Sequence, residues 1–265
     1  MVEYAYQWFM PYKKEQPTIV CLHGFTGTSN TFQTLKFSEA YNYLGIDLIG
    51  HGKTSVFVHP DHYQMTNVIR ELQALLQHLA ITSYYVLGYS MGGRVALAWG
   101  LTDENVKGII LENASPGLAT LPERTTRIDK DNRLAQRLLT EPLGDFIDFW
   151  QALPLFDSQK QLSPKIQAKI RQERMSQQPY GLAMSLFMMG TGQQPSYWNQ
   201  LETTIPLLYI TGEWDHKFQE IARKMHIKQS AMHIHTVPNA GHCVHVEQPD
   251  MFLQLVENWL KEQLG

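Results

Sequence analysis

The sequence predicts an α/β fold with a mostly parallel, doubly wound sheet and a helical lid inserted after the strand that ends near Glu112. Strand-like runs alternate with segments of helical spacing on both sides of that insertion, which is typical of a parallel sheet covered on both faces. Within the insertion no convincing strand occurs, and prolines separate four helix-like stretches. We therefore divide the 265 residues into a core of residues 1–118 and 199–265 and a lid of residues 119–198.

The composition is that of an ordinary globular protein and argues against several classes of function. Hydrophobic residues make up 43% of the chain, charged residues make up 18%, and the net charge is −3, so we expect no nucleic-acid partner. No apolar run is long enough to span a bilayer, and the N-terminus lacks the features of a secretory signal. Cys21 and Cys243 are expected to be buried free thiols, with a disulfide disfavoured. We expect a cytoplasmic monomer or weak homo-oligomer without membrane insertion.

The first half of the chain contains short runs rich in β-branched and aromatic residues, separated by helix patterns. The expected strands are Tyr4–Met10 at an edge of the sheet, Thr18–Leu22, Tyr43–Ile49, a run from Tyr84 into Gly88, and Val106–Leu111. The expected helices are a short one around Phe32–Phe37, Met65–Leu79 with one apolar face, and Arg94–Leu101.

The second half of the chain begins with the inserted helices, which we expect to pack over the carboxyl edge of the sheet. These are Asp131–Leu139, Gly144–Leu153, Pro164–Met175 and Tyr180–Met189. The sheet then resumes with strands Ile205–Thr211 and Met232–Val237 on either side of a helix about Phe218–Met225, and an amphipathic helix starts at Pro249.

The run Gly88-Tyr89-Ser90-Met91-Gly92 lies between an expected strand and an expected helix. A serine in such a tight turn needs small neighbours and projects its hydroxyl above the sheet, at the positive end of the following helix. The early segment His23-Gly24-Phe25 also follows a strand. A loop of that kind can offer one main-chain N–H to an oxyanion, here from Phe25, and Met91 can offer the second.

Ser90, Asp215 and His242 follow three separate expected strand ends, in the chain order serine, acid, histidine. In a catalytic triad the histidine accepts the serine proton, and the acid fixes the tautomer of the imidazole and stabilises its cation. An isolated aspartate or histidine in a loop is usually a turn former or a solvated group, so the joint placement is what favours catalysis.

Other polar residues at strand ends are weaker candidates for the same roles. Glu112 is the competing acid, but it lacks the glycine-led loop found around Asp215. His245 is the competing base and lies in the turn before the last helix, where a structural role is expected. His23 and His51 are also expected to fix loops rather than to take part in chemistry.

Several motifs together resemble a known fold family. These are His-Gly-Phe at 23–25, Gly-Tyr-Ser-Met-Gly-Gly-Arg at 88–94, Gly-Glu-x-Asp-x-Lys-Phe at 212–218 and Ala-Gly-His-x-x-His-x-Glu at 240–247. They match the α/β-hydrolase fold. Ser-Pro-Gly-Leu at 115–118, Leu-Pro-Leu-Phe at 153–156 and Gly-Thr-Gly-Gln-Gln-Pro at 190–195 narrow the resemblance further. The chain looks like the 2-succinyl-6-hydroxy-2,4-cyclohexadiene-1-carboxylate synthases of menaquinone biosynthesis.

This resemblance implies a lyase that eliminates pyruvate from 2-succinyl-5-enolpyruvyl-6-hydroxy-3-cyclohexene-1-carboxylate. The Ser90–His242–Asp215 triad would then act as a base, with no acyl-enzyme. No metal or organic cofactor is expected, because the sequence contains no ligand cluster or phosphate loop.

Arg94 gives independent support for a substrate that carries two or three carboxylates. It lies one helical turn after Ser90, and arginine binds carboxylates bidentately. Most lid arginines are expected to be solvated. By resemblance we select Arg127 and Arg174 as substrate-binding residues, with Arg124 and Arg171 as substitutes, and add Tyr89 and Trp150 as further contacts.

Two other functions stay open on the sequence alone. A serine hydrolase acting on esters or carbon–carbon bonds could use the same triad, and it would turn over simple aryl esters. A non-catalytic ligand receptor on the same fold would bind tightly without turnover, and the complete triad argues against it.

Overall fold

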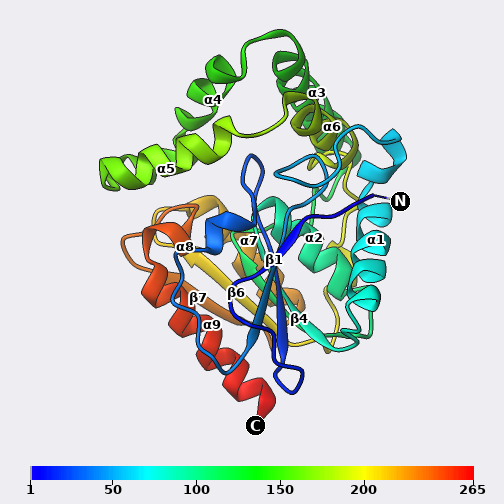
Figure 1. The fold of residues 1–265 in the computed structure, drawn as a ribbon, viewed down its shortest axis with the longest axis vertical. Coiled ribbons are helices and arrows are strands. Elements are labelled where there is room, and N and C mark those ends of the chain that lie inside the picture. Colours follow the sequence, from blue (N-terminus) through cyan, green and yellow to red (C-terminus); the bar gives the residue numbers. More distant parts are fainter. Residues whose placement is uncertain (1) are drawn as a thin grey trace.

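Seven strands form one sheet in the computed structural model, which describes residues 2–265 (Figure 1). The sheet order is β1-β3-β2-β4-β5-β6-β7, and β1 pairs antiparallel with β3 while the other pairs are parallel. The strands are β1 (Tyr6–Trp8), β2 (Thr18–Leu22), β3 (Asn42–Ile46), β4 (Tyr84–Tyr89), β5 (Val106–Glu112), β6 (Leu207–Gly212) and β7 (His233–Val237). The predicted α/β fold with a mostly parallel sheet is confirmed, and the expected edge strand β1 is the one that runs antiparallel to its neighbour.

Helices cover both faces of the sheet, as the alternation of the strand side chains requires. The α-helices are α1 (Met65–His78), α2 (Met91–Gly100), α3 (Leu121–Thr140), α4 (Leu143–Gln151), α5 (Pro164–Met175), α6 (Pro179–Met189), α7 (His216–Lys228), α8 (Val244–Glu247) and α9 (Pro249–Leu264). Short 3-10 helices are η1 (Ser29–Phe32), η2 (Pro60–Tyr63), η3 (Pro154–Gln161) and η4 (Trp198–Gln200). Val20 and Leu22 pack in the core shared with α1, α2 and α7, whereas Ile19 and Cys21 pack toward α9.

Helices α3 to α6 lie between β5 and β6 in the chain and extend beyond one end of the sheet in Figure 1. They bury a small apolar cluster of their own, formed by Ala135, Leu138, Phe146, Ile147, Leu182, Ala183 and Leu186. A separate core of this kind supports our proposal that residues 119–198 form a distinct lid.

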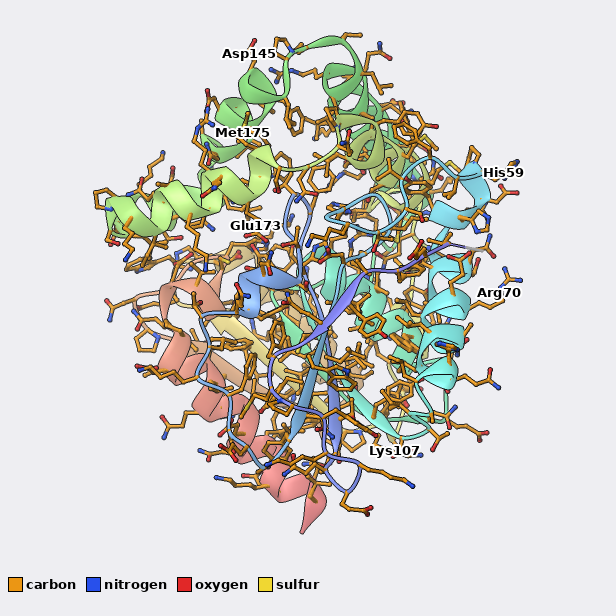
Figure 2. All side chains as sticks on the ribbon, in the orientation of Figure 1. His59, Arg70, Lys107, Asp145, Glu173 and Met175 are labelled. Atoms are coloured by element: carbon orange, nitrogen blue, oxygen red, sulfur yellow. The ribbon has the colours of Figure 1, made fainter. Side chains whose placement is uncertain are left out.

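The contacts that attach this insertion to the core include a pair of hydrogen bonds and a close approach of two backbone segments. Glu173 on α5, labelled in Figure 2, accepts hydrogen bonds from the main-chain N–H of Thr28 at 2.8 Å and from its hydroxyl at 2.5 Å. At the start of α6, Gly181 lies directly against the backbone of Gly50, which has a φ of 80°. A Cβ atom on Gly50 would lie 2.5 Å from the carbonyl oxygen of Gly181, so no side chain fits between the two segments.

Most predicted elements are shifted at their ends by one to three residues, and three of the differences have an identifiable local cause. The short helix expected at Phe32–Phe37 is the 3-10 helix Ser29–Phe32, and the strand expected to reach Ile49 ends at Ile46. Both differences involve Asp47, which accepts hydrogen bonds from Ser29 N at 2.7 Å and from Lys53 N at 3.0 Å. These contacts turn the chain directly after β3. The first lid helix starts at Leu121 rather than at Asp131, because Thr120 and Glu123 form a capping box.

Cys21 and Cys243 are both buried and free, as predicted. Within residues 2–265, no helix has the length and apolar character needed to cross a membrane.

Candidate active site

Ser90 occupies a strained turn between β4 and α2. Its φ of 51° lies in the left-handed region, which is unfavourable for a serine, and the main-chain N–H donates to the carbonyl of Glu112 at 2.8 Å. Gly92 allows the turn to close, because a Cβ atom there would overlap the carbonyl of Leu22. The hydroxyl of Ser90 consequently projects above the carboxyl end of the sheet at the N-terminus of α2.

Ser90, His242 and Asp215 form a continuous hydrogen-bonded chain. Nε2 of His242 lies 3.0 Å from the Oγ atom of Ser90, and Nδ1 of His242 lies 2.6 Å from Oδ2 of Asp215. A carboxylate only accepts, so Nδ1 carries the proton and Nε2 is free to take the serine proton. Oδ1 of Asp215 accepts from Phe218 N at 3.2 Å, which fixes the carboxylate at the start of α7. Both Asp215 and His242 are buried.

A cavity of about 180 Å³ opens over the Ser90 hydroxyl. Phe25 and Met91, the expected oxyanion donors, both line it. Met91 is the first residue of α2, so its N–H has no acceptor within the helix. Trp150 from α4 forms part of the wall and packs edge-on against Phe25, with ring centres 5.2 Å apart. The geometry therefore suits a proton transfer beside a developing oxyanion, under an aromatic cover.

Three cationic side chains line the same cavity: Arg94, Arg127 and Lys217. Arg94 is buried, and its Nη1 atom donates to Met189 O and to Gln194 Oε1, both at 2.9 Å. Burial, followed by repulsion from Arg127, lowers the pKa of Arg94 to about 10. The guanidinium thus keeps its charge at neutral pH, and its hydrogen bonds to neutral acceptors leave that charge available to an anionic ligand.

Residues 19–255 match the alpha/beta hydrolase family. A protein of Bacillus subtilis (strain 168), provisionally named 2-succinyl-6-hydroxy-2,4-cyclohexadiene-1-carboxylate synthase, is 40% identical over 91% of this chain and 89% of its own length. The chain belongs to this synthase family. A Serratia proteamaculans (strain 568) synthase of the same name is 30% identical over 93% of this chain and 94% of its own. The solved structure of MenH from S. aureus has a TM-score of 0.92 and 33% identity, covering 98% of this chain and 99% of that one.

The structure of this synthase-family chain distinguishes among the lid arginines. Arg127 lines the cavity and pairs with Asp131, with 2.7 Å between Nε and Oδ1. Its alternative, Arg124, instead donates from Nε to Gly192 O at 3.2 Å and does not line the cavity. The register chosen from the sequence therefore places the cavity residue at Arg127.

Arg174 lies in a smaller adjoining cavity of about 40 Å³, separated from the Ser90 cavity by Phe156. It is buried, its Nη2 donates to Gln159 Oε1 at 3.2 Å, and its guanidinium lies 4.8 Å from the centre of the Phe156 ring. Its alternative, Arg171, forms an exposed ion pair with Asp148 at 2.8 Å. The structure therefore does not bring Arg174 into the cavity of Ser90.

Tyr89 and Trp150, the two aromatic contacts expected from the family resemblance, both line the Ser90 cavity. The indole N–H of Trp150 is buried and has no hydrogen-bond partner among residues 2–265. A donor in this position is suited to a polar group of a ligand.

Sequence reasoning missed Lys217 and Asn113, which also line the cavity. Lys217 is part of the Gly-Glu-x-Asp-x-Lys-Phe run, two residues after Asp215, so its spacing was a usable signal. Burial, followed by repulsion from Arg127, lowers the pKa of Lys217. Asn113 follows β5 directly, and only the fold reveals that it reaches the cavity.

The competing histidines have structural partners. Nε2 of His23 accepts from Leu48 N at 2.9 Å, and Nδ1 of His51 lies 3.1 Å from Ile49 O. His245 pairs with Glu112 rather than with Ser90. The competing acid and base are thus bonded to each other, outside the Ser90 relay.

Proposed function

We propose that this chain catalyses the elimination of pyruvate from 2-succinyl-5-enolpyruvyl-6-hydroxy-3-cyclohexene-1-carboxylate, giving 2-succinyl-6-hydroxy-2,4-cyclohexadiene-1-carboxylate in menaquinone biosynthesis. The observation that carries the proposal is a complete Ser90–His242–Asp215 relay beside three cationic side chains in one cavity. The names of the relatives support the same reaction. An ordinary ester carries no charge, so these cations favour a substrate with several carboxylates.

In the proposed mechanism, Ser90 abstracts the ring proton α to the succinyl ketone while its own proton moves to Nε2 of His242. Asp215 stabilises the resulting imidazolium through Nδ1. The ketone oxygen becomes an enolate that accepts hydrogen bonds from the main-chain N–H groups of Phe25 and Met91. The electron pair then passes through the ring alkene, the carbon–oxygen bond to enolpyruvate breaks, and the proton on His242 is returned as pyruvate forms.

The cations have a separate role in binding and orienting the substrate. Arg94 lies one helical turn from Ser90, and Arg127 and Lys217 reach the cavity from α3 and α7. Carboxylates held by these groups would place the acidic ring carbon near the Ser90 oxygen. We propose Tyr89 and Trp150 as additional substrate contacts and Arg174 as a longer-range contributor of positive charge.

The decisive experiment measures pyruvate release from the enolpyruvyl substrate beside hydrolysis of a simple aryl ester. We expect rapid pyruvate release and slow ester hydrolysis. Ser90→Ala and His242→Ala should each lower pyruvate release at least about a hundredfold, since each removes the base relay, while circular dichroism stays unchanged. Full activity in Ser90→Ala would refute the scheme. Preferential ester turnover would indicate a hydrolase, and tight binding without any turnover would indicate a receptor.

A further inference from the structure

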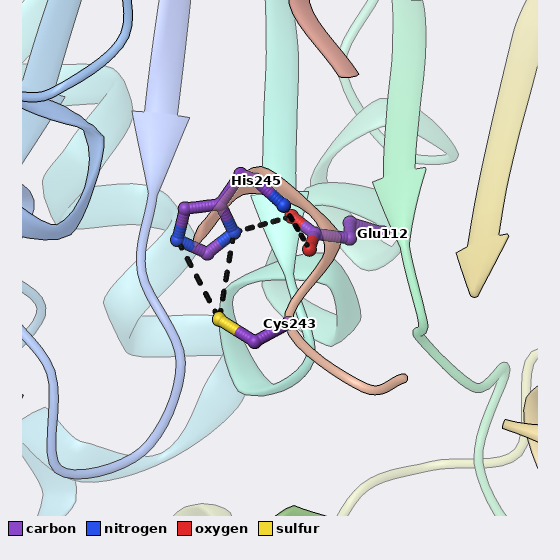
Figure 3. Close-up of side chains that lie close together, drawn as sticks. All are labelled: Glu112, Cys243 and His245. Atoms are coloured by element: carbon purple, nitrogen blue, oxygen red, sulfur yellow. Dashed lines mark hydrogen bonds and ion pairs between the residues drawn. The ribbon is translucent and has the colours of Figure 1, made fainter. Parts of the chain in front are cut away.

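Glu112, Cys243 and His245 form a buried polar cluster (Figure 3). Glutamate, cysteine and histidine are a donor set that zinc uses. Here, however, the donors are already engaged, since His245 Nδ1 lies 2.7 Å from Glu112 Oε2 and His245 Nε2 lies 2.7 Å from Thr31 Oγ1. The sulfur of Cys243 is 3.8 and 3.9 Å from the two ring nitrogens and so lies on the lone-pair axis of neither. The cluster is a hydrogen-bonded pair, not a metal site.

Glu112 accepts hydrogen bonds from two groups of His245. Besides the ring contact, its Oε1 atom accepts from the main-chain N–H of His245 at 3.0 Å. Burial would lower the pKa of His245, but its contacts with Cys243 and Glu112 raise that pKa well above its usual value. Burial also raises the pKa of the Cys243 thiol. Glu112 and His245 thus form an enclosed hydrogen-bonded pair, three residues after His242 in the chain.

Two adjacent residues at the end of β5 contact both sides of the triad. The carbonyl of Glu112 accepts from the main-chain N–H of Ser90 at 2.8 Å. The Nδ2 atom of Asn113 donates to the carbonyl of His242 at 2.9 Å and to that of Gly241 at 3.3 Å. One rigid strand end therefore touches the Ser90 turn through its backbone and the His242 loop through two side chains.

We propose that Glu112 and Asn113 are positioning residues that set the separation between the Ser90 oxygen and Nε2 of His242, with His245 as the anchor of the His242 loop. The backbone of Asn113 supports this role, because its φ of 45° lies in the left-handed region, which asparagine tolerates better than most residues. That conformation lets the side chain reach back to the His242 loop. The proposal rests on the proposed role of the triad.

The test compares Glu112→Gln with Asp103→Asn. Asp103 is a matched control, since it is a buried carboxylate that accepts from Tyr84 Oη at 2.6 Å and Trp99 Nε1 at 2.9 Å, at the opposite end of the sheet. We expect Glu112→Gln to lower kcat for pyruvate release about tenfold or more with KM within about twofold, because the change affects alignment and not binding. Asp103→Asn should destabilise the fold similarly and keep kcat within about twofold of the parent.

Two further variants test the anchoring of His245 in other ways. Thr31→Val removes only the hydroxyl partner of His245 and should give a smaller fall in kcat, even if Glu112→Gln folds poorly. The double variant Glu112→Gln/His245→Asn should have a kcat no lower than that of the less active of the two single variants, because both changes remove the same contact. The proposal would be overturned if Glu112→Gln and Thr31→Val both had the same kcat as Asp103→Asn at matched stability.

Reaction of Ser90 with a fluorophosphonate separates this proposal from the proposed function. The labelling rate depends on the Ser90–His242 alignment and not on the enolpyruvyl substrate. Slower labelling in Glu112→Gln than in Asp103→Asn supports positioning even if the parent protein releases no pyruvate. Equal labelling rates in the two variants would argue against positioning whatever the substrate.

Discussion

The buried histidines near the active site differ from His242 in their surroundings. The rings of His23 and His51 lie 5.1 Å apart and are fully enclosed, and no carboxylate among residues 2–265 is in hydrogen-bond contact with either ring. Burial lowers the pKa of both, and that of His51 falls to about 3. Both rings are therefore neutral in the folded protein at pH values where an unfolded histidine takes up a proton.

This difference predicts acid sensitivity. A folded pKa below the unfolded value means that the unfolded chain binds more protons, so stability is lost as pH falls from about 6.5 toward 3. Between pH 6.5 and pH 4.5, His51→Asn should lose about 2 kcal/mol less unfolding free energy than the parent. Urea unfolding at the two pH values measures this, with the exposed His78 changed to Gln as the control. An equal loss in parent and His51→Asn would contradict the assignment.

At the scale of elements, predictions were best where the signal lies within one segment. Strand Thr18–Leu22 and helix Pro164–Met175 have the predicted bounds, since a compact β-branched run and a proline at a helix start are local signals. The Ser-Asp-His arrangement could be predicted because each residue follows a recognisable strand. The end of β3 could not, because it depends on Asp47 reaching Ser29. The position of Arg174 behind Phe156 likewise depends on how α5 packs.

The start of α3 provides a local test. Thr120 accepts from Glu123 N, and Glu123 accepts from Thr120 N at 2.9 Å, so two otherwise free donors are satisfied. Thr120→Ala should lower the free energy of unfolding by about 1 kcal/mol, because it removes the cap. Thr126→Ala, an exposed change in the interior of the same helix, should be neutral or slightly stabilising. Denaturant unfolding of both variants measures these free energies. An equal change in the two variants would mean that the cap contributes nothing to stability.

For the whole molecule, the charge of the cavity opposes that of the chain. The net charge is −3, yet Arg94, Arg127 and Lys217 gather beside Ser90. Of the three, Arg127 is also paired with Asp131 through its Nε atom. A cavity with one sign of charge attracts anions, and added salt screens that attraction over roughly 10 Å.

We therefore expect kcat/KM for pyruvate release to fall as ionic strength rises. Lys217→Met should raise KM about tenfold, leave kcat within a few-fold, and make kcat/KM less dependent on salt. Lys228→Met, an exposed change at the end of the same helix, is the control and should keep the parent's salt dependence. Steady-state kinetics at several salt concentrations measure both. Identical salt profiles for Lys217→Met and the parent would remove Lys217 from substrate attraction.

The contact between Gly50 and Gly181 has an evolutionary consequence. The two backbones touch, so neither position can gain a side chain while the other segment stays in place. Substitution at one position would force α6, and with it the wall of the cavity, away from the sheet. The two glycines should therefore persist together in descendants that keep this reaction. Where a lineage has lost one of them, we expect a reshaped lid and a different substrate.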